Sequence, residues 1–158
     1  MKALIEDTRQ KAEKHKTKHK YFAAEGIGVT RCALPYGDYA PPPKVAVDTK
    51  EGIAEIAYNM CSSSKEKTRF KNECIKAKED GCKLIFLIED TKFSQISDLY
   101  GTKVHLYSGQ TVPGNQLALA MHIMSERYGC EYLFCRPEDA GRKIMELLNE
   151  TERMDKDL

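Results

Sequence analysis

The residues with the clearest capacity for chemistry lie at the end of a predicted strand, where Asp48, Thr49 and Lys50 follow an apolar run. Residues two apart in a strand point to the same face, so the Asp48 carboxylate and the Lys50 ammonium project together. Asp38 lies ten residues earlier, and a chain reversal between them would bring the two carboxylates close. Neighbouring carboxylates repel each other, and a divalent cation offsets that repulsion. Oxygen ligands favour Mg²⁺ or Mn²⁺ over zinc.

Such a set of residues is typical of phosphodiester hydrolysis. A bound metal polarises a non-bridging oxygen and lowers the pKa of a bound water, and Lys50 stabilises the developing negative charge. The triplet alone is not specific, because Asp90, Thr91 and Lys92 repeat it after a second apolar run. Asp48 is favoured because it has a second acidic partner at a nearby strand end, and Asp90 has none.

Strands and helices alternate along the chain and would position these residues. Residues 83–89 form an almost purely apolar run, which is typical of a buried strand in a parallel sheet. In the strand before Lys50, the face with Val45, Val47 and Thr49 is predicted to face the core. The pattern predicts an α/β fold with a hairpin or meander at one end and helices on both sides of the sheet. The expected strands are 3–7, 27–33, 44–50, 83–89, 103–107 and 131–135, and the expected helices are 52–60, 64–81, 113–129 and one from 137 onward.

Length and composition predict one globular domain over residues 1–150, followed by a charged, flexible tail over 151–158. The 25 basic and 24 acidic side chains nearly cancel. No apolar run approaches the roughly 20 residues of a membrane span. The N-terminus turns acidic too early for a signal peptide, so an intracellular, cytoplasmic protein is expected. The six cysteines form no C-x-x-C pair, and reduced thiols are predicted.

Two segments are basic despite the net charge of +1. Residues 1–20 carry seven Lys or Arg against three acids, and residues 65–83 carry seven against four. Basic segments attract polyanions, although a lysine-rich face is often simply solvated. The run Lys11–Lys20 is expected to be a mobile basic loop or hairpin tip that touches DNA phosphate. The alternative is a helix on which His15 and His19 form a metal site.

Four stretches, in the same order along the chain, resemble the domain of XPF-type endonucleases in the PD-(D/E)xK restriction-endonuclease-like superfamily. LPYGDYAPPPKVAVDTKEGIAEIA is similar to the family's L-P-x-G-D-Y and the strand after it, which ends in E-R-K. LIEDTRQ is similar to its first strand with D-T-R-E, RFKNECIKAKEDGCKLIFLIED to its R-F-x-x-Q helix and next strand, and LFCRPEDAGRKIMELL to its last strand and helix. The resemblance spans roughly residues 3–148. It implies a three-layer fold with a mixed central sheet flanked by helices.

By position, the resemblance implies that Asp7, Asp38 and Asp48 are metal ligands and that Lys50 is the superfamily's lysine. Asp38, Asp48 and Lys50 form the catalytic set in this interpretation. The implied cofactor is Mg²⁺, with Mn²⁺ as a substitute. The predicted DNA contacts are Arg9, Lys65, Lys67 and Arg69, and the possible supporting acids are Glu55 and Glu89.

The chain departs from the family pattern at five positions, the first of which is Asp48 in place of a glutamate, a change that the superfamily tolerates. Thr49 stands where an arginine is usual, and Gln10 replaces a glutamate. Ala54 stands where an acid is expected, and Glu73 stands in place of a glutamine. These departures put in doubt a DNA or structural contact at Thr49 and an acidic group at Gln10.

The expected function is therefore metal-dependent DNA cleavage, selective for branched or flap DNA, in repair or recombination. DNA is the expected partner, and a homodimer or a partner subunit that recognises DNA structure is also expected. The small size is typical of a prokaryotic or phage protein. The alternative is a non-catalytic DNA-binding or scaffold subunit with a degenerate nuclease site. A small-molecule phosphohydrolase is a third hypothesis, which rests only on generic metal-site chemistry.

Overall fold

The computed structural model describes residues 2–9 and 11–156. The chain divides into two compact units: a smaller unit of Met1–Pro43 with Glu79–Cys82, and a larger unit of Lys44–Lys78 with Lys83–Leu158. The single domain expected over residues 1–150 stays a prediction. Among the described helices, none combines the length and the apolar character that crossing a membrane requires.

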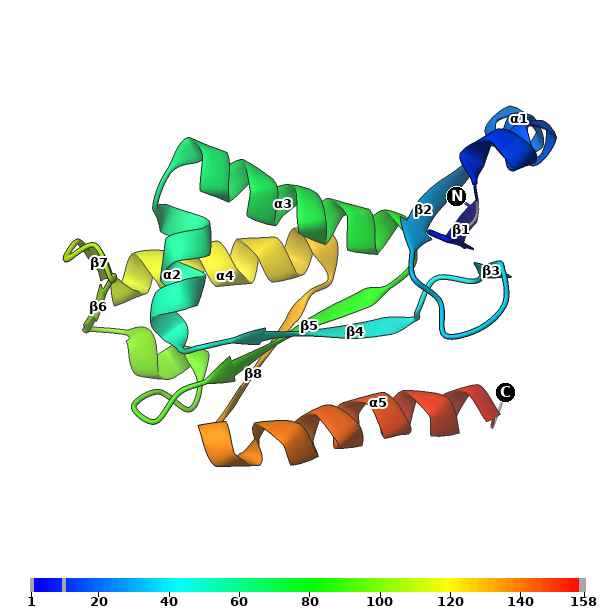
Figure 1. The fold of residues 1–158 in the computed structure, drawn as a ribbon. Helices are drawn as coiled ribbons and strands as arrows, with labels where there is room; N and C mark the ends of the chain where they lie inside the picture. The colour runs from blue at the N-terminus through cyan, green and yellow to red at the C-terminus, as the bar shows by residue number, and fades with distance from the viewer. Residues whose placement is uncertain (1, 10, 157–158) are drawn as a thin grey trace. The chain divides into compact units, whose positions relative to one another are not determined.

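The smaller unit contains a β-α-β arrangement with a short third strand (Figure 1). Strand β1 (Lys2–Asp7) runs parallel to β2 (Ile27–Cys32), and β3 (Tyr39–Ala40) pairs antiparallel with β1. The expected hairpin or meander at this end is therefore wrong. Parallel neighbours need a crossover connection, and here the crossover is helical. It consists of the 3-10 helix η1 (Ala12–His15) and helix α1 (Lys16–Ala24).

The predicted mobile loop over Lys11–Lys20 is also wrong, because most of this run is helical. The signal for a helix lies in His15, His19 and Phe22, which recur at intervals of about one turn. These three side chains are half-buried, whereas the lysines between them are exposed. Two of the three are histidines, so the stripe lacks the apolar character by which amphipathic helices are recognised.

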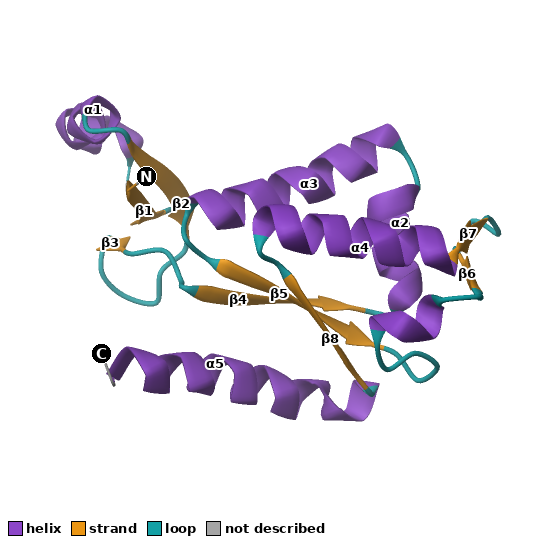
Figure 2. Cartoon of the chain, turned by 180° about the vertical axis from the view of Figure 1, so that it is seen from behind, coloured by secondary structure: helices purple, strands orange, loops and turns teal. Residues whose placement is uncertain are grey.

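The larger unit has three layers around a parallel sheet of order β4-β5-β8 (Figure 2). The central strand β5 is buried from Leu84 to Ile88, which confirms the prediction from the apolar run. Helices α2, α3 and α4 cover one face of the sheet, and α5 covers the other. This confirms the α/β class with helices on both sides of the sheet. The bounds are β4 (Val45–Lys50), α2 (Ile53–Cys61), α3 (Ser64–Glu79), β5 (Lys83–Glu89), η2 (Ile96–Leu99), β6 (Lys103–His105), β7 (Thr111–Pro113), α4 (Gly114–Tyr128), β8 (Glu131–Cys135), η3 (Pro137–Asp139) and α5 (Ala140–Lys156).

The main core lies between this sheet and the layer of α2, α3 and α4. Phe70 of α3 stacks on Phe86 of β5 with ring centroids 5.0 Å apart, and Leu117 and Met121 of α4 are fully buried beside them. All six cysteines are free thiols, as predicted. Helix α5 continues to Lys156, so the backbone is helical beyond residue 150, where the tail was expected to begin.

Candidate functional site

The predicted pair of Asp48 and Lys50 lies on one face of β4, as the spacing indicates. Lys50 Nζ lies 3.2 Å from Asp48 Oδ2. The Lys50 side chain is only 7% exposed, and its ammonium lies 5.7 and 5.6 Å from the ring centroids of Phe70 and Phe86. Close to both stacked rings, the ammonium makes cation–π contacts and neutralises the neighbouring carboxylate.

The face of β4 that carries this pair is turned toward the main core. Phe70 belongs to α3, so Lys50 points under the helical layer, while Val45 and Val47 on the opposite face are only half-buried and Thr49 is exposed. The expectation that Val45, Val47 and Thr49 would face the core is therefore wrong. A period of two separates the faces of a strand but does not say which layer each face meets.

A second carboxyl group, from Glu73 of α3, lies beside Asp48. The side chains of Glu73 and Asp48 lie close enough to interact electrostatically. Burial raises the pKa of Glu73, and the negative charge of Asp48 raises it further. Sequence reasoning noted Glu73 only as a departure from the family pattern. Its position next to Asp48 depends on how α3 crosses β4, which no local pattern encodes.

Glu66 and Arg69 form a polar cluster on the same helix. Glu66 accepts hydrogen bonds from Arg69 Nη2 at 2.6 Å and from Asn59 Nδ2 at 2.8 Å. The hydrogen bond from Arg69 lowers the pKa of Glu66, as does the more distant charge of Lys50, against the opposing effect of burial. The Ser63 hydroxyl accepts from the Glu66 amide at 3.2 Å and so caps the start of α3. The Arg69 side chain is 58% exposed, which leaves its other face available to a phosphate.

Asp7 and Arg9 meet in the smaller unit. The Arg9 amide donates to Asp7 Oδ1 at 3.1 Å, and the Arg9 guanidinium donates to Asp7 Oδ2 at 2.6 Å and to the Leu34 carbonyl at 2.8 Å. The side-chain hydrogen bond from Arg9 lowers the pKa of the buried Asp7. The Asp7 amide donates to the Asp38 carbonyl at 2.9 Å, while the Asp38 residue itself is exposed. The structure thus brings Asp7, Arg9 and Asp38 together.

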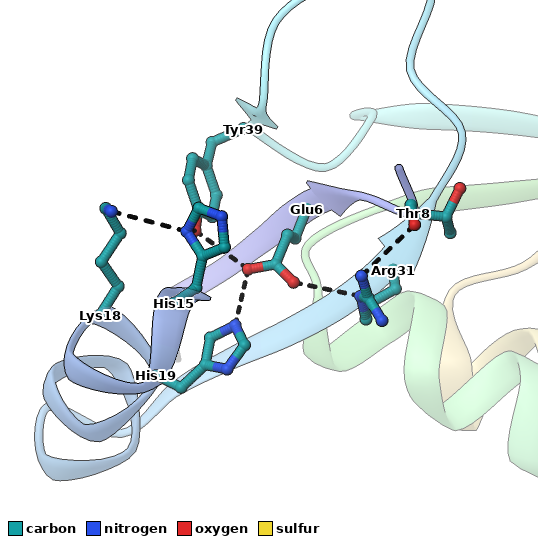
Figure 3. Close-up of polar contacts among 7 residues, drawn as sticks. All are labelled: Glu6, Thr8, His15, Lys18, His19, Arg31 and Tyr39. Carbon is teal, nitrogen blue, oxygen red and sulfur yellow. Dashed lines mark hydrogen bonds and ion pairs between the residues drawn. The ribbon is translucent and has the colours of Figure 1, made fainter. Parts of the chain in front are cut away.

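Sequence reasoning missed a third cluster, around Glu6 (Figure 3). Glu6 is fully buried, and its Oε2 accepts from His19 Nε2 at 2.7 Å and from the Tyr39 hydroxyl at 3.0 Å. Its Oε1 pairs with Arg31 Nε at 3.1 Å. Burial alone would raise the pKa of Glu6, but these partners together lower it. The Tyr39 hydroxyl also lies 3.2 Å from His15 Nδ1.

The second Asp-Thr-Lys triplet has a structural role. Asp90 Oδ2 accepts from the amide of Ile53 at the start of α2, at 2.9 Å. Its Oδ1 accepts from the amides of Lys92 at 2.7 Å and Phe93 at 3.1 Å. Asp90 therefore caps α2 and holds its own turn, which agrees with the preference for Asp48.

The remaining predicted residues lie near the ends of elements. Glu55 accepts from the Glu51 amide at 3.3 Å in the first turn of α2, and Glu89 is the half-buried last residue of β5. Lys65 and Lys67 are exposed in the first turn of α3. Ala54 is half-buried in α2, and Gln10 lies outside the described residues.

The carboxylates expected to share a metal belong to different units: Asp7 and Asp38 to the smaller, and Asp48 to the larger. Within residues 2–9 and 11–156, no three His, Cys, Asp or Glu side chains are grouped so that they could hold a metal ion. The three-carboxylate site stays a prediction. Asp48 and Glu73 nevertheless suit Mg²⁺, which commonly takes one or two protein carboxylates and completes its shell with water and substrate phosphate oxygens.

Comparison with known proteins gives similarity at the level of structure alone. No protein-family model matches the sequence, and no curated protein matches it. Solved structures of XPF from Aeropyrum pernix, one in complex with DNA, match 98% of this chain, with TM-scores of 0.47 and identities of 15% and 17%. This chain covers 66% and 67% of those two chains, about two thirds of their length.

Proposed function

We propose that this protein is a metal-dependent DNA endonuclease whose reaction centre is built around Asp48, Lys50 and Glu73. The observation that carries the proposal is the placement of a nearly buried lysine beside two neighbouring carboxyl groups. A site with this composition suits phosphodiester hydrolysis, which needs a cation for the phosphate and a fixed positive charge for the developing anion.

Asp48 and Glu73 would hold the metal in this proposal. The charge of Asp48 raises the pKa of the neighbouring Glu73, so the two carboxylates repel each other and a bound cation would relieve that repulsion. When bound, Mg²⁺ lowers the pKa of a coordinated water and polarises a phosphate oxygen. Because the pKa of Glu73 is raised, a cation held there would compete with protons, and its affinity would rise with pH.

Lys50 acts as an electrostatic group. Its ammonium is held by Asp48 on one side and by the rings of Phe70 and Phe86 on the other. A charge fixed in this way needs little reorganisation when negative charge develops on the phosphate. Arg69, with more than half of its side chain exposed, is placed to receive a flanking phosphate.

The second candidate is a DNA-binding scaffold with a degenerate site. It is favoured by Asp7, whose two carboxylate oxygens both accept hydrogen bonds from Arg9. A metal at Asp7 would have to replace this arginine.

The endonuclease proposal includes three finer expectations. They are selectivity for branched or flap DNA, a role in repair or recombination, and assembly as a homodimer or with a partner subunit.

The test is cleavage of labelled linear, flap and four-way DNA in Mg²⁺ and in Mn²⁺. Lys50→Met keeps an apolar side chain of similar length beside the two rings, and we expect it to lower the cleavage rate at least about 100-fold, as does removal of other groups that stabilise charge in a transition state. Lys92→Met is the matched control, since it alters the same triplet at the structural site, and it should cut normally.

Asp48→Asn completes the test. We expect it to abolish cleavage and also the rise in melting temperature that Mg²⁺ gives the unaltered protein. If none of the DNA substrates is cut, and the protein binds DNA equally with and without metal, the scaffold hypothesis would instead be established.

A further inference from the structure

Helix α1 is held to its sheet in an unusual way. None of its residues is buried. The side chains that face the sheet are His19 and Phe22 of α1 and His15 at the end of η1, and the closest contact is the hydrogen bond from His19 to the buried Glu6 (Figure 3). Polar and aromatic contacts with Glu6 and Tyr39 therefore orient this helix, in place of an apolar stripe.

The lysines flank this inward stripe on both sides. Lys16 and Lys20 are four residues apart in α1, so they lie one turn apart on one flank of the helix; Lys18 lies on the opposite flank, and Lys14 precedes it in η1. All four are exposed. We call them the flanking lysines. The outward stripe between the two pairs consists of Thr17, Tyr21 and Ala24, at intervals of four and three residues, and all three are exposed.

This distribution of charge weakens the helix by itself. Like charges four residues apart repel each other, and α1 has nine residues with no buried side chain to offset the repulsion. Of the carboxylates in the described chain, none forms an ion pair with a flanking lysine. A polyanion whose charges run along both flanks would remove this cost. Conflicts between local preference and structure of this kind concentrate at functional sites.

The outward stripe favours nucleic acid over a lipid surface. A helix that binds a membrane presents a broad apolar face to the acyl chains. Here the outward stripe is a threonine, an alanine and one tyrosine, which is 60% exposed. The two phosphate strands that border a groove match two rows of lysines, and an aromatic ring between the rows can contact bases or sugars.

We propose that α1 and the 3-10 helix η1 before it lie along a groove of duplex DNA, with Lys14 and Lys18 contacting phosphates of one strand and Lys16 and Lys20 those of the other. The inference rests on the proposed function for the choice of DNA, but it concerns binding alone and needs neither cleavage nor metal. Glu6 is a positioning residue here, because it fixes through His19 which face of the helix is turned outward.

The test measures binding of a fluorescent 20-base-pair duplex in EDTA at KCl concentrations from 50 to 300 mM. Each phosphate contact that is lost makes the slope of log K against log salt shallower by about 0.9. We expect Lys16→Gln with Lys20→Gln to make it shallower by about 1.8, and to weaken binding at 0.1 M salt roughly 60-fold. Lys14→Gln with Lys18→Gln should do the same.

The matched control replaces two exposed lysines of the larger unit, Lys103 and Lys156, by glutamine. It removes the same charge and should leave the slope unchanged. Lys16→Arg with Lys20→Arg should retain the slope of the unaltered protein, because arginine also contacts phosphate. Melting temperatures should not fall in the glutamine variants, since the repulsion along the helix is relieved.

An unchanged slope in both glutamine pairs would overturn the proposal, and a change in only one pair would overturn the seating of the helix between two strands. If the glutamine variants lose binding to phosphatidylserine vesicles while the DNA slope is unchanged, the helix binds a membrane and the proposal is overturned as well. If DNA is never cut in Mg²⁺ but both glutamine pairs make the salt slope shallower, the proposed nuclease function fails and this inference stands.

Discussion

Replacing Glu6 by glutamine tests whether the buried carboxylate organises the smaller unit. The substitution preserves the shape of the side chain and removes its charge. Hydrogen bonds to a charged group are worth about 1.5–3 kcal/mol and neutral ones about 1 kcal/mol. Glu6 receives such bonds from His19 and Tyr39, in addition to its ion pair with Arg31. Because Arg31 is partly exposed and its pairing is screened, we expect Glu6→Gln to destabilise this unit by about 2–3 kcal/mol.

The assay is amide hydrogen exchange at pH 7, read separately for β1, β2 and β5. A loss of 2–3 kcal/mol accelerates exchange through local opening roughly 30- to 150-fold. The acceleration should be confined to β1 and β2, with β5 of the larger unit as the internal reference. Glu13→Gln is the matched control, because Glu13 is an exposed acid in η1. Equal acceleration in both variants would refute a specific role for Glu6.

The pH dependence provides a second check on the same reasoning. The pKa of Glu6 is lower in the folded state than its ordinary value of 4.5. Its stabilising contribution is therefore complete above pH 4.5 and disappears as the pH falls through the lowered folded pKa. The difference between the unaltered protein and Glu6→Gln should shrink below pH 4.5. A difference that stays constant down to pH 3 would mean that shape, and not charge, holds the network.

Two further predictions concern the larger unit. Gly114→Ala should lower the free energy of unfolding by about 3 kcal/mol, because a Cβ there would lie 1.8 Å from the Leu99 carbonyl oxygen. Gly141→Ala in α5 should raise it by about 0.5–1 kcal/mol, because a Cβ there meets no atom within 4 Å. Chemical denaturation of both variants measures the contrast, and equal effects would contradict the packing at Leu99. Glu73→Gln should stabilise the protein at pH 7 by about 1 kcal/mol, the scale of one like-charge contact. Because the pKa of Glu73 is raised in the folded state, its charge destabilises the protein progressively as the pH rises from the ordinary value of 4.5 to the raised value. The stability gained by Glu73→Gln should therefore vanish below pH 4.5. Thermal unfolding at pH 4 and pH 7 measures this gain. Glu79→Gln is the control, because Glu79 is an exposed acid at the end of the same helix. A gain from Glu73→Gln that is the same at both pH values would contradict the prediction.

The sequence predicted best those elements whose signals are local. The apolar run over 83–89 became the buried central strand, and Asp48 and Lys50 share a face because the strand period is two. The Ser63 cap and the end of α3 before Gly81 follow from side-chain chemistry within one turn. In each case the residues that determine the structure lie within a few positions of one another.

Features that depend on distant residues were not predictable in the same way. Glu73 meets Asp48 across 25 residues, and its position depends on the path of α3 over β4. The parallel pairing of β1 and β2 depends on α1, whose inward stripe is mostly histidine and therefore reads as polar. Glu6 is buried although charged residues are ordinarily exposed, and its partners lie 13, 25 and 33 residues away.

Glu6 and Asp7 show why burial alone does not identify a functional carboxylate. They are adjacent in β1, so they point to opposite faces, and both are almost completely buried. Glu6 is bound by three side chains from α1, β2 and β3, and releasing it would disconnect those elements. The side-chain partner of Asp7 is Arg9, two residues away and 62% exposed. Asp7 is therefore held by a residue within its own turn, and Glu6 is the carboxylate that connects the helix and the strands of the unit.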